Sequence, residues 1–231
     1  MTMQMPDVTT IPTRLVSSER HARQTAAARC AGYGALSELA CSPHDMDPRG
    51  SLREKINIVT ALDYAEGLDD LLREFVALDL DQLKYEYSAL FEVGSDGPPC
   101  PIREDLHTGQ RKGTREDLVR FYSHFNYKLE EKFAWIPDHL SVELEFMHFL
   151  CFREASAESD AVSYQLAQVD FSARHLVNWV PELAKSVAKV ATDSIYRRAI
   201  DVIEQFLAAD YAWQCGTIAN QAGDTKDEDN E

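Results

Sequence analysis

One stretch, residues 137–150 with the sequence PDHLSVELEFMHFL, constrains the fold of this chain more than any other. No glycine or proline follows for many residues, and proline is favoured in the first turn of a helix. We therefore predict a helix that begins at Pro137, with the Asp138 carboxylate at its positive end. At about 100° per residue, its apolar side chains cover an arc of roughly 220°. A helix with so wide an apolar face lies deep inside a helical protein.

Two polar side chains interrupt this helix in an informative way. Glu143 falls in the middle of the apolar arc, and His139 lies one turn before it. A buried carboxylate is costly unless it is paired. Two interpretations stay open: a satisfied core pair between His139 and Glu143, or a ligand-contacting spot of Asp138, His139 and Glu143 at the mouth of a helical bundle. Three further polar side chains share a narrow strip that we expect to face water: Ser141, Glu145 and His148.

The remaining pattern is helical as well. A stripe of Leu80, Leu83, Tyr87, Leu90 and Phe91 repeats at helical spacing, which predicts one buried helix face. No strand pattern or internal repeat occurs, so we predict an all-α fold. Further helices are expected over roughly 17–41, 51–67, 68–75, 114–126, 164–181 and 193–213. We predict a capping box at Ser51 and Glu54, Thr114 as an N-cap and Asn126 as a left-handed C-cap. His175 is expected to be a buried structural histidine.

The pattern also suggests boundaries. Residues 1–16 mix proline, threonine and methionine without a period and are expected to be disordered. Residues 17–213 should form a single helical-bundle domain, and residues 214–231 an acidic, disordered tail. A long loop rich in proline, which includes Pro99, follows the helix that ends near Phe91. Loops of that length are commonly functional or disordered.

Charge and cysteine content narrow the possible partners and compartments. The net charge of −16 argues against nucleic acid or an anionic membrane and favours a cationic partner. The five cysteines contain no CxxC pair, which fits a reducing compartment. With no apolar leader or membrane-length apolar run, the sequence predicts a cytoplasmic protein.

A search for catalytic and metal motifs gives one alternative. Glu-x-x-His occurs at Glu104/His107 and at Glu145/His148, and two such pairs help to build the di-iron centre of ferritin-like bundles. Glu145 and His148 lie on the strip predicted to face water, which counts against that site. A helical adaptor without a peptide groove is a further alternative. No nucleotide-binding or nucleophile motif is present, so neither an enzyme nor a resident cofactor or metal is predicted.

Several short motifs, in order along the chain, resemble those of the TorD/DmsD-type redox-enzyme maturation chaperones, a family that includes the NarJ type. The match covers roughly residues 20–213. Its residues are the stretch 137–150, Tyr87 to Phe91, Pro98 and Pro99, Phe121 and Tyr122, and His175, Leu176, Trp179 and Pro181.

The resemblance implies a TorD-like helical bundle that binds rather than catalyses. Such chaperones hold the twin-arginine signal peptide of a molybdenum-containing catalytic subunit, of the dimethyl sulfoxide reductase type, until its cofactor is inserted before export. The client is expected among the dehydrogenases of ethylbenzene or dimethylsulfide and the reductases of chlorate or selenate. The chaperone is expected to be a monomer or a domain-swapped homodimer. The peptide-binding residues are expected to be Asp138, His139, Tyr87, Leu90, Phe91, Pro99, Pro137, Glu104 and Glu143, with Tyr87, Leu90 and Phe91 flooring an apolar groove.

Overall fold

The computed structural model describes residues 20, 22–58, 62, 64–65, 67–95, 97–108, 113–130, 136–157 and 160–227. Within these residues the protein is helical, and its only β-type pairings are isolated bridges, so the predicted all-α class is confirmed. The elements are α1 (Ala22–Ala40), α2 (Arg49–Lys55), α3 (Leu68–Ala77), α4 (Leu80–Phe91), α5 (Glu104–His107), α6 (Thr114–His124), α7 (Leu140–Ser156), α8 (Ala161–Phe171), the π-helix η4 (Ser172–Leu176), α9 (Val180–Val190) and α10 (Ile195–Asp227).

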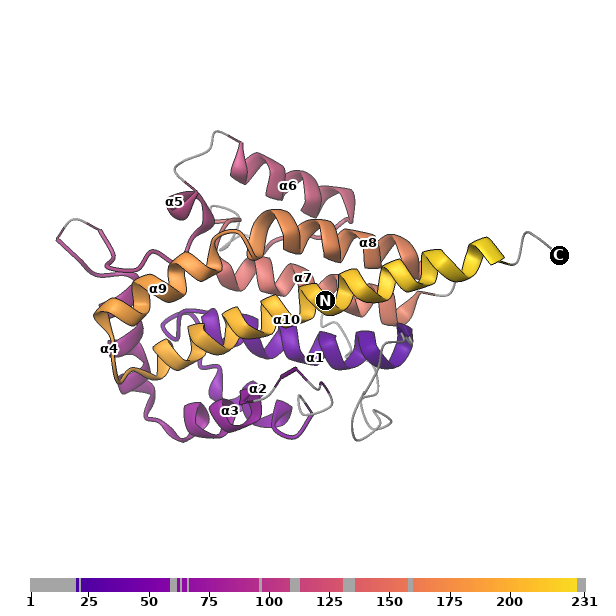
Figure 1. The fold of residues 1–231 in the computed structure, drawn as a ribbon. Helices are drawn as coiled ribbons and strands as arrows, with labels where there is room; N and C mark the ends of the chain where they lie inside the picture. Colours follow the sequence, from indigo (N-terminus) through magenta and orange to yellow (C-terminus); the bar gives the residue numbers. More distant parts are fainter. Residues whose placement is uncertain are drawn as a thin grey trace.

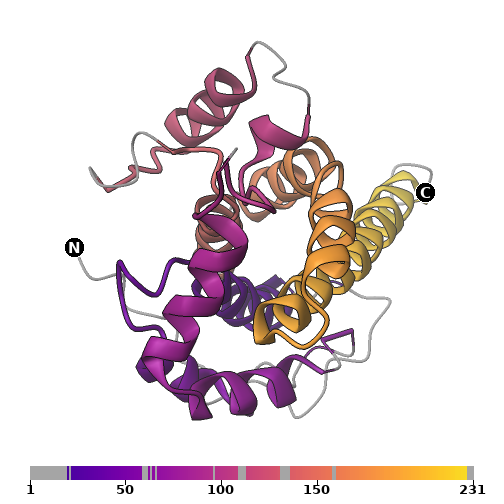
Figure 2. The ribbon, with the colours of Figure 1, turned by 90° about the vertical axis from the view of Figure 1, so that its left-hand side faces the viewer.

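Helix α7 is the centre of the bundle, as its apolar arc predicts. It packs along its length against α1 and is flanked by α8, while α10 packs against α9, α8 and α1. Helices α5 and α6 lie on one side of this layer and α2 and α3 on the opposite side (Figure 1). Figure 2 looks along the bundle and shows α6 at its outer edge.

The start of α7 differs from the prediction. The helix begins at Leu140, and His139 is its N-cap, with Nδ1 accepting a hydrogen bond from the Ser141 backbone N–H at 3.2 Å. Pro137 and Asp138 therefore precede the helix instead of forming its first turn. The side chain of Asp138 is fully buried, whereas a residue in an exposed first turn would lie near water.

The strip of α7 predicted to face water is covered by α1. Only Glu145 of the three polar residues is exposed; Ser141 is buried and His148 is half-buried. A side chain at Gly34 would place its Cβ 3.0 Å from Nδ1 of His148, so the glycine allows the two helices to approach closely. Nδ1 of His148 donates to the Cys30 carbonyl at 2.8 Å instead of meeting solvent.

The helix predicted over residues 51–67 is much shorter in the structure. Helix α2 begins at Arg49 and ends at Lys55, and Asn57 adopts a left-handed conformation with φ of 69°. The Ser51 hydroxyl donates to Glu38 at 2.7 Å, so the predicted capping box is not formed. By contrast, Asn126 has φ of 55° just after α6, as predicted.

The last helix continues beyond the predicted domain boundary. Helix α10 runs through Asp227, and Gln214 and Thr217 are buried against the bundle, although residues 214–231 were expected to form a disordered tail. Residues 1–16 and the final residues 228–231 lie outside the described part of the chain.

A buried network of charges explains why α10 stays packed on the bundle as far as Gln214 and Thr217. The Arg29 guanidinium of α1 pairs with both carboxylate oxygens of Asp210, at 2.7 and 2.9 Å. Although burial alone raises it, the pKa of Asp210 is held below its usual value by this guanidinium and by phenol donors that include Tyr33. The Trp213 ring lies 5.2 Å from the guanidinium carbons of both Arg20 and Arg29. The middle of the last helix is therefore fixed to the first helix.

Candidate functional site

Two segments that lie 35 positions apart in the sequence meet at the start of α7. The backbone N–H of Glu104 donates to the Asp138 carbonyl at 3.0 Å, and the N–H of Leu140 donates to Ile102 at 3.2 Å. Arg103 and His139 form an isolated antiparallel bridge between these bonds. This pairing places the residues that follow the proline-rich loop beside the start of α7.

The Asp138 carboxylate lies within a cluster of two acids and two arginines. Arg103 reaches both of its oxygens at 3.2 Å, and Nε of Arg115 lies 3.2 Å from Oδ1. Asp105 contacts the same two guanidinium groups at 3.3 Å. Burial, and then the neighbouring Asp138, raise the pKa of Asp105 to about 6. Asp138 is therefore already engaged by cations of its own chain.

Glu104 forms a second buried pair, with His175. Its Oε2 lies 3.0 Å from Nδ1 of His175, and both residues are buried. His175 is supplied by η4, a π-helical turn that continues directly from α8. Such turns occur frequently at functional sites because they re-aim a side chain within a helix. The predicted burial of His175 is confirmed, and burial raises the pKa of Glu104.

Glu143 does not pair with His139, so the core-pair interpretation is wrong. Its Oε2 accepts a hydrogen bond from Nε1 of Trp179 at 3.2 Å. Complete burial, and next the nearby Glu104 carboxylate, raise the pKa of Glu143 well above its usual value. The surroundings of Glu143, which include the neighbouring Glu104, thus favour its protonated form.

His139 turns in another direction, towards α4. Its Nε2 lies 3.3 Å from the Tyr87 hydroxyl, and burial lowers the pKa of His139 to about 4. Tyr87 and Phe91 pack edge to face on each other and on Tyr196 of α10. These rings and Leu90 are buried, and Tyr87 connects them to His139.

Two cavities open between α6 and the α8–η4 helix, beside the Glu104–His175 pair. One, of about 770 Å³, is lined by Glu104, His175 and Asn178, together with Asp117 and Arg174. The other, of about 650 Å³, shares Asp117 and Arg174 and continues along α6 and α8. We call the two together the α6–α8 groove. Its second half has an apolar floor of Phe121, Phe125, Leu166 and Ala167.

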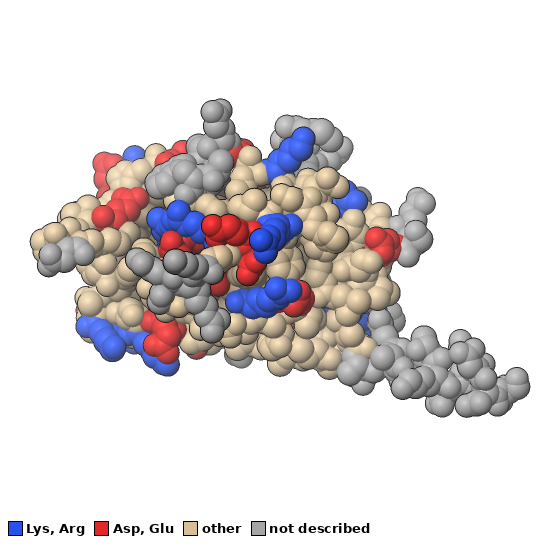
Figure 3. Space-filling model, turned by 90° about the horizontal axis from the view of Figure 1, so that it is seen from above, with Lys and Arg blue, Asp and Glu red and all other residues tan. Residues whose placement is uncertain are grey.

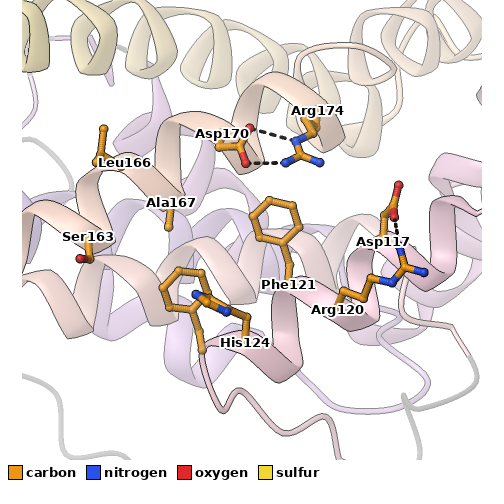
Figure 4. A pocket seen from close by; sticks show the side chains of 10 residues that line it. Asp117, Arg120, Phe121, His124, Ser163, Leu166, Ala167, Asp170 and Arg174 are labelled. Atoms are coloured by element: carbon orange, nitrogen blue, oxygen red, sulfur yellow. Dashed lines mark hydrogen bonds and ion pairs between the residues drawn. The ribbon is translucent and has the colours of Figure 1, made fainter.

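Charged side chains form the edges of the α6–α8 groove. Figure 4 shows Arg174 paired with Asp170 on α8, facing Arg120 paired with Asp117 on α6, with Phe121 between them. From above, acidic and basic side chains alternate over this face of the molecule (Figure 3). An apolar floor with edges of both signs can hold an extended or helical peptide that carries an apolar stretch.

The structure thus brings together part of the predicted site. Asp138, Glu104 and Glu143 converge, and Pro137 is buried beside them. Pro99 is exposed in its loop, and Tyr87, Leu90 and Phe91 lie behind His139 instead of along the α6–α8 groove. The residues that sequence reasoning missed are Arg103, Asp105 and Arg115, which no periodic pattern marks, and the groove residues of α6 and α8.

The di-metal alternative finds no support in this geometry. Among the residues that the structure describes, no three histidine, cysteine, aspartate or glutamate side chains lie close enough to hold a metal ion. Nε2 of His107 lies 2.6 Å from the Pro101 carbonyl, and His148 binds the Cys30 carbonyl. No described helix has both the length and the hydropathy to span a membrane.

Comparison with known proteins gives a consistent result. The chain is 34% identical over 153 residues to the selenate reductase assembly chaperone protein of Thauera selenatis, covering 64% of this chain and 78% of that protein. It is 39% identical over 125 residues to the perchlorate reductase assembly chaperone protein of Dechloromonas aromatica, covering 52% and 55%. A match of 35% to the chlorate reductase assembly chaperone protein of Ideonella dechloratans covers 52% and 64%. These relatives are named as chaperones, not as catalysts.

A solved structure shares the fold. The crystal structure of a candidate redox enzyme maturation protein from Archaeoglobus fulgidus superposes with a TM-score of 0.51 and 22% identity, over 78% of this chain and 93% of that one. Residues 59–185, which contain α3 to α8, η4 and the charged cluster, match the family described as nitrate reductase delta subunit. The protein therefore belongs to the nitrate reductase delta subunit family, which includes the NarJ-type maturation chaperones that its sequence resembles.

Proposed function

We propose that this protein is a cytoplasmic assembly chaperone for the catalytic subunit of a molybdenum-containing reductase. The names of the relatives favour a client that reduces an oxyanion such as selenate, perchlorate or chlorate. In this proposal the chaperone binds the client's twin-arginine signal peptide, together with the unfinished subunit, until the cofactor has been inserted. The release of the complete enzyme then permits export.

The observation that carries the binding proposal is the α6–α8 groove and the acids at its end. A twin-arginine peptide has a cationic start followed by an apolar stretch. The apolar floor of Phe121, Leu166 and Ala167 suits the apolar stretch. Glu104 lines one end of the groove, and its backbone N–H donates to the carbonyl of Asp138, which lies buried next to it. Carboxylates at such a place can accept bidentate hydrogen bonds from guanidinium groups. The net charge of −16 adds a long-range attraction for the cationic start.

The other predicted residues have supporting roles in this arrangement. Tyr87 contacts His139, which caps α7 beside Asp138, and the buried Leu90 and Phe91 lie on the same helix as Tyr87. Glu143 and Trp179 form the polar base beneath Glu104 and His175. Pro137 and Pro99 shape the two segments that frame the acids.

A pair of substitutions tests the groove. Leu166 on α8 is 53% exposed on the groove floor, and Val190 at the end of α9 is 57% exposed and does not line it. Leu166→Asp should weaken binding of a synthetic twin-arginine peptide by about tenfold or more, since it places a charge where the apolar stretch docks. Val190→Asp adds the same charge elsewhere and should bind like wild type. Equal effects of the two variants would contradict the groove.

The client is identified by a separate experiment. Tagged wild-type protein is recovered from its native host, and proteins that co-purify are identified by mass spectrometry, with Leu166→Asp as the matched control. A molybdenum-enzyme subunit that is retained by wild type and lost from the variant supports the proposal. Recovery of no such subunit with wild type would contradict it.

A further inference from the structure

The charged cluster at Asp138 has a geometry that bears on how a client would enter. Two carboxylates, of Asp138 and Asp105, share two guanidinium groups, of Arg103 and Arg115. A twin-arginine peptide would bring the same chemical groups in the same number. The chain therefore fills its own acidic site with the type of group that the site is proposed to bind.

The arginines form the outer layer of this cluster. The side chain of Asp138 has no exposed surface, whereas those of Arg103 and Arg115 are 23% and 41% exposed. A guanidinium group arriving from solvent can reach the buried carboxylate only if one of the two arginines moves. Asp105 is also partly exposed, at 21%.

The internal arginines are held less tightly than others in the same protein. Their distances to the two carboxylates are 3.2–3.3 Å, longer than the 2.7–2.9 Å between Arg29 and Asp210. Charge-assisted hydrogen bonds are strongest at about 2.7–2.9 Å. Partial exposure further reduces the cost of transferring either guanidinium group to water.

Arg115 is the easier of the two to displace. It is the second residue of α6 (Thr114–His124), where the positive end of the helix dipole disfavours a cation. Arg103 is more firmly placed, because its backbone bridges His139 and its side chain contacts both oxygens of Asp138. Burial, and then Asp138, keep the pKa of Asp105 raised even with both arginines present.

We propose that Arg103 and Arg115 are internal occupants of the client's arginine site, and that a peptide with two adjacent arginines binds Asp105 and Asp138 by displacing them into solvent. This inference rests on the proposed function and adds to it a self-inhibiting contact and a further binding residue, Asp105. Peptides with a single arginine, or with lysines, cannot replace both guanidinium groups. The contact therefore selects for a pair of arginines at the expense of affinity.

The test is a calorimetric titration of a synthetic peptide that carries two adjacent arginines before an apolar stretch. Arg115→Gln removes one internal competitor and should tighten binding by about fivefold or more. Arg73→Gln is the matched control, because Arg73 on α3 is 50% exposed, pairs with Asp69, and lies on the opposite side of the bundle. It makes the negative net charge larger by the same single unit and should leave the affinity within about twofold of wild type. Asp105→Asn should weaken binding about as much as Asp138→Asn does.

Two further results bear on the inference. Arg115→Lys, which keeps the charge but loses the planar fork, should give an intermediate affinity. If wild type binds and Asp138→Asn does not, but Arg115→Gln binds no better than Arg73→Gln, self-occupancy is overturned while the proposed function stands. If neither wild type nor Arg115→Gln binds the peptide, although both melt cooperatively, the arginine site itself is refuted. Arg103→Gln is a second variant in which the same tightening of peptide binding is expected. A thermal melt checks that this variant is folded.

Discussion

Oε2 of Glu104 lies 3.0 Å from Nδ1 of His175, although 71 positions separate the two residues in sequence. The pair is buried at the end of the α6–α8 groove and links the segment after the proline-rich loop to the π-helical turn. Because Glu143 lies beneath it, a second ionised carboxylate at this place would be repelled. The folded protein therefore favours the protonated form of Glu143 more than the unfolded chain does.

This preference for the protonated form leads to a prediction about pH. The folded protein raises the pKa of Glu143 above its ordinary value of 4.5, so its contribution to stability is full below about pH 4.5. That contribution is lost as the pH rises through the folded pKa. Glu143→Gln imitates the protonated carboxyl and does not titrate. The Tm of this variant, relative to wild type, should rise between pH 5 and pH 8 in thermal melts monitored by circular dichroism.

Glu54→Gln, at an exposed position of α2, is the control for the pH experiment. Its Tm difference from wild type should stay constant over the same range. A flat difference for Glu143→Gln as well would show that Glu143 titrates normally in the folded protein.

A second prediction concerns the buried Arg29–Asp210 pair. Asp210→Asn removes the nearer counter-charge of the fully buried Arg29 guanidinium group, leaving the Glu154 carboxylate at 3.5 Å, and should lower the free energy of unfolding by about 3–5 kcal/mol. Asp201→Asn, on the same helix, breaks a partly exposed contact to Arg197 of 3.6 Å and should cost less than about 0.5 kcal/mol. Urea denaturation of both variants gives the comparison. Equal costs would mean that the buried pair contributes no more than a surface pair.

A third prediction compares two glycines. At Gly34, an added Cβ would approach His148 to 3.0 Å, so Gly34→Ala should destabilise the protein by about 1–3 kcal/mol through overpacking. At Gly50 in α2, an added Cβ meets nothing within 4 Å. Gly50→Ala should therefore stabilise the protein by up to about 1 kcal/mol, because the unfolded chain loses conformational freedom. Differential scanning calorimetry would reveal the opposite signs, and a gain at both positions would contradict close packing of α1 on α7.

A fourth prediction concerns the stability of Asp138→Asn. The sequence placed Asp138 in an exposed first turn, where its loss would hardly change folding. The structure buries it between Arg103 and Arg115, so we expect a cost of about 1–2 kcal/mol, limited because both arginines can hydrate. Chemical denaturation measures this cost, and binding is compared only under conditions in which the variant is folded. An unchanged midpoint would mean that Asp138 contributes no net stability.

Features of the fold that depend on local sequence can be predicted from it, whereas features that depend on contacts between distant residues cannot. The body of α7 and the stripe Leu80–Phe91 follow from local periodicity and are found as expected, although α7 begins at Leu140 and not at Pro137. Asn126 is also a local feature, because its residue type tolerates the left-handed conformation. The helix predicted over 51–67 is wrong because α2 ends at Lys55, where Ile56 leaves the helical conformation and Asn57 is left-handed.

The site was harder to predict because its contacts are non-local. Glu143 was singled out as a polar residue within an apolar arc, Asp138 as a carboxylate at the helix start, and Glu104 through the family resemblance, and the three do converge. Their partners could not be inferred from the sequence. The bridge with His139 places Arg103, the start of α6 places Arg115, and the π-helical turn places His175. Likewise, the cover of α1 over His148 depends on a glycine whose packing role only a partner helix reveals.

The network that ties Asp210 and Trp213 to Arg29 has a consequence for synthesis. Arg29 leaves the ribosome 181 residues before Asp210, and a guanidinium group cannot be buried cheaply without its counter-charge. Once α7 has been made, its Glu154 carboxylate lies 3.5 Å from this guanidinium group and is a more distant counter-charge. The closer pairing with Asp210 forms only when the last helix emerges, and until then the growing chain exposes the apolar surface that α10 covers, which is the kind of surface that the protein is proposed to shield in its client.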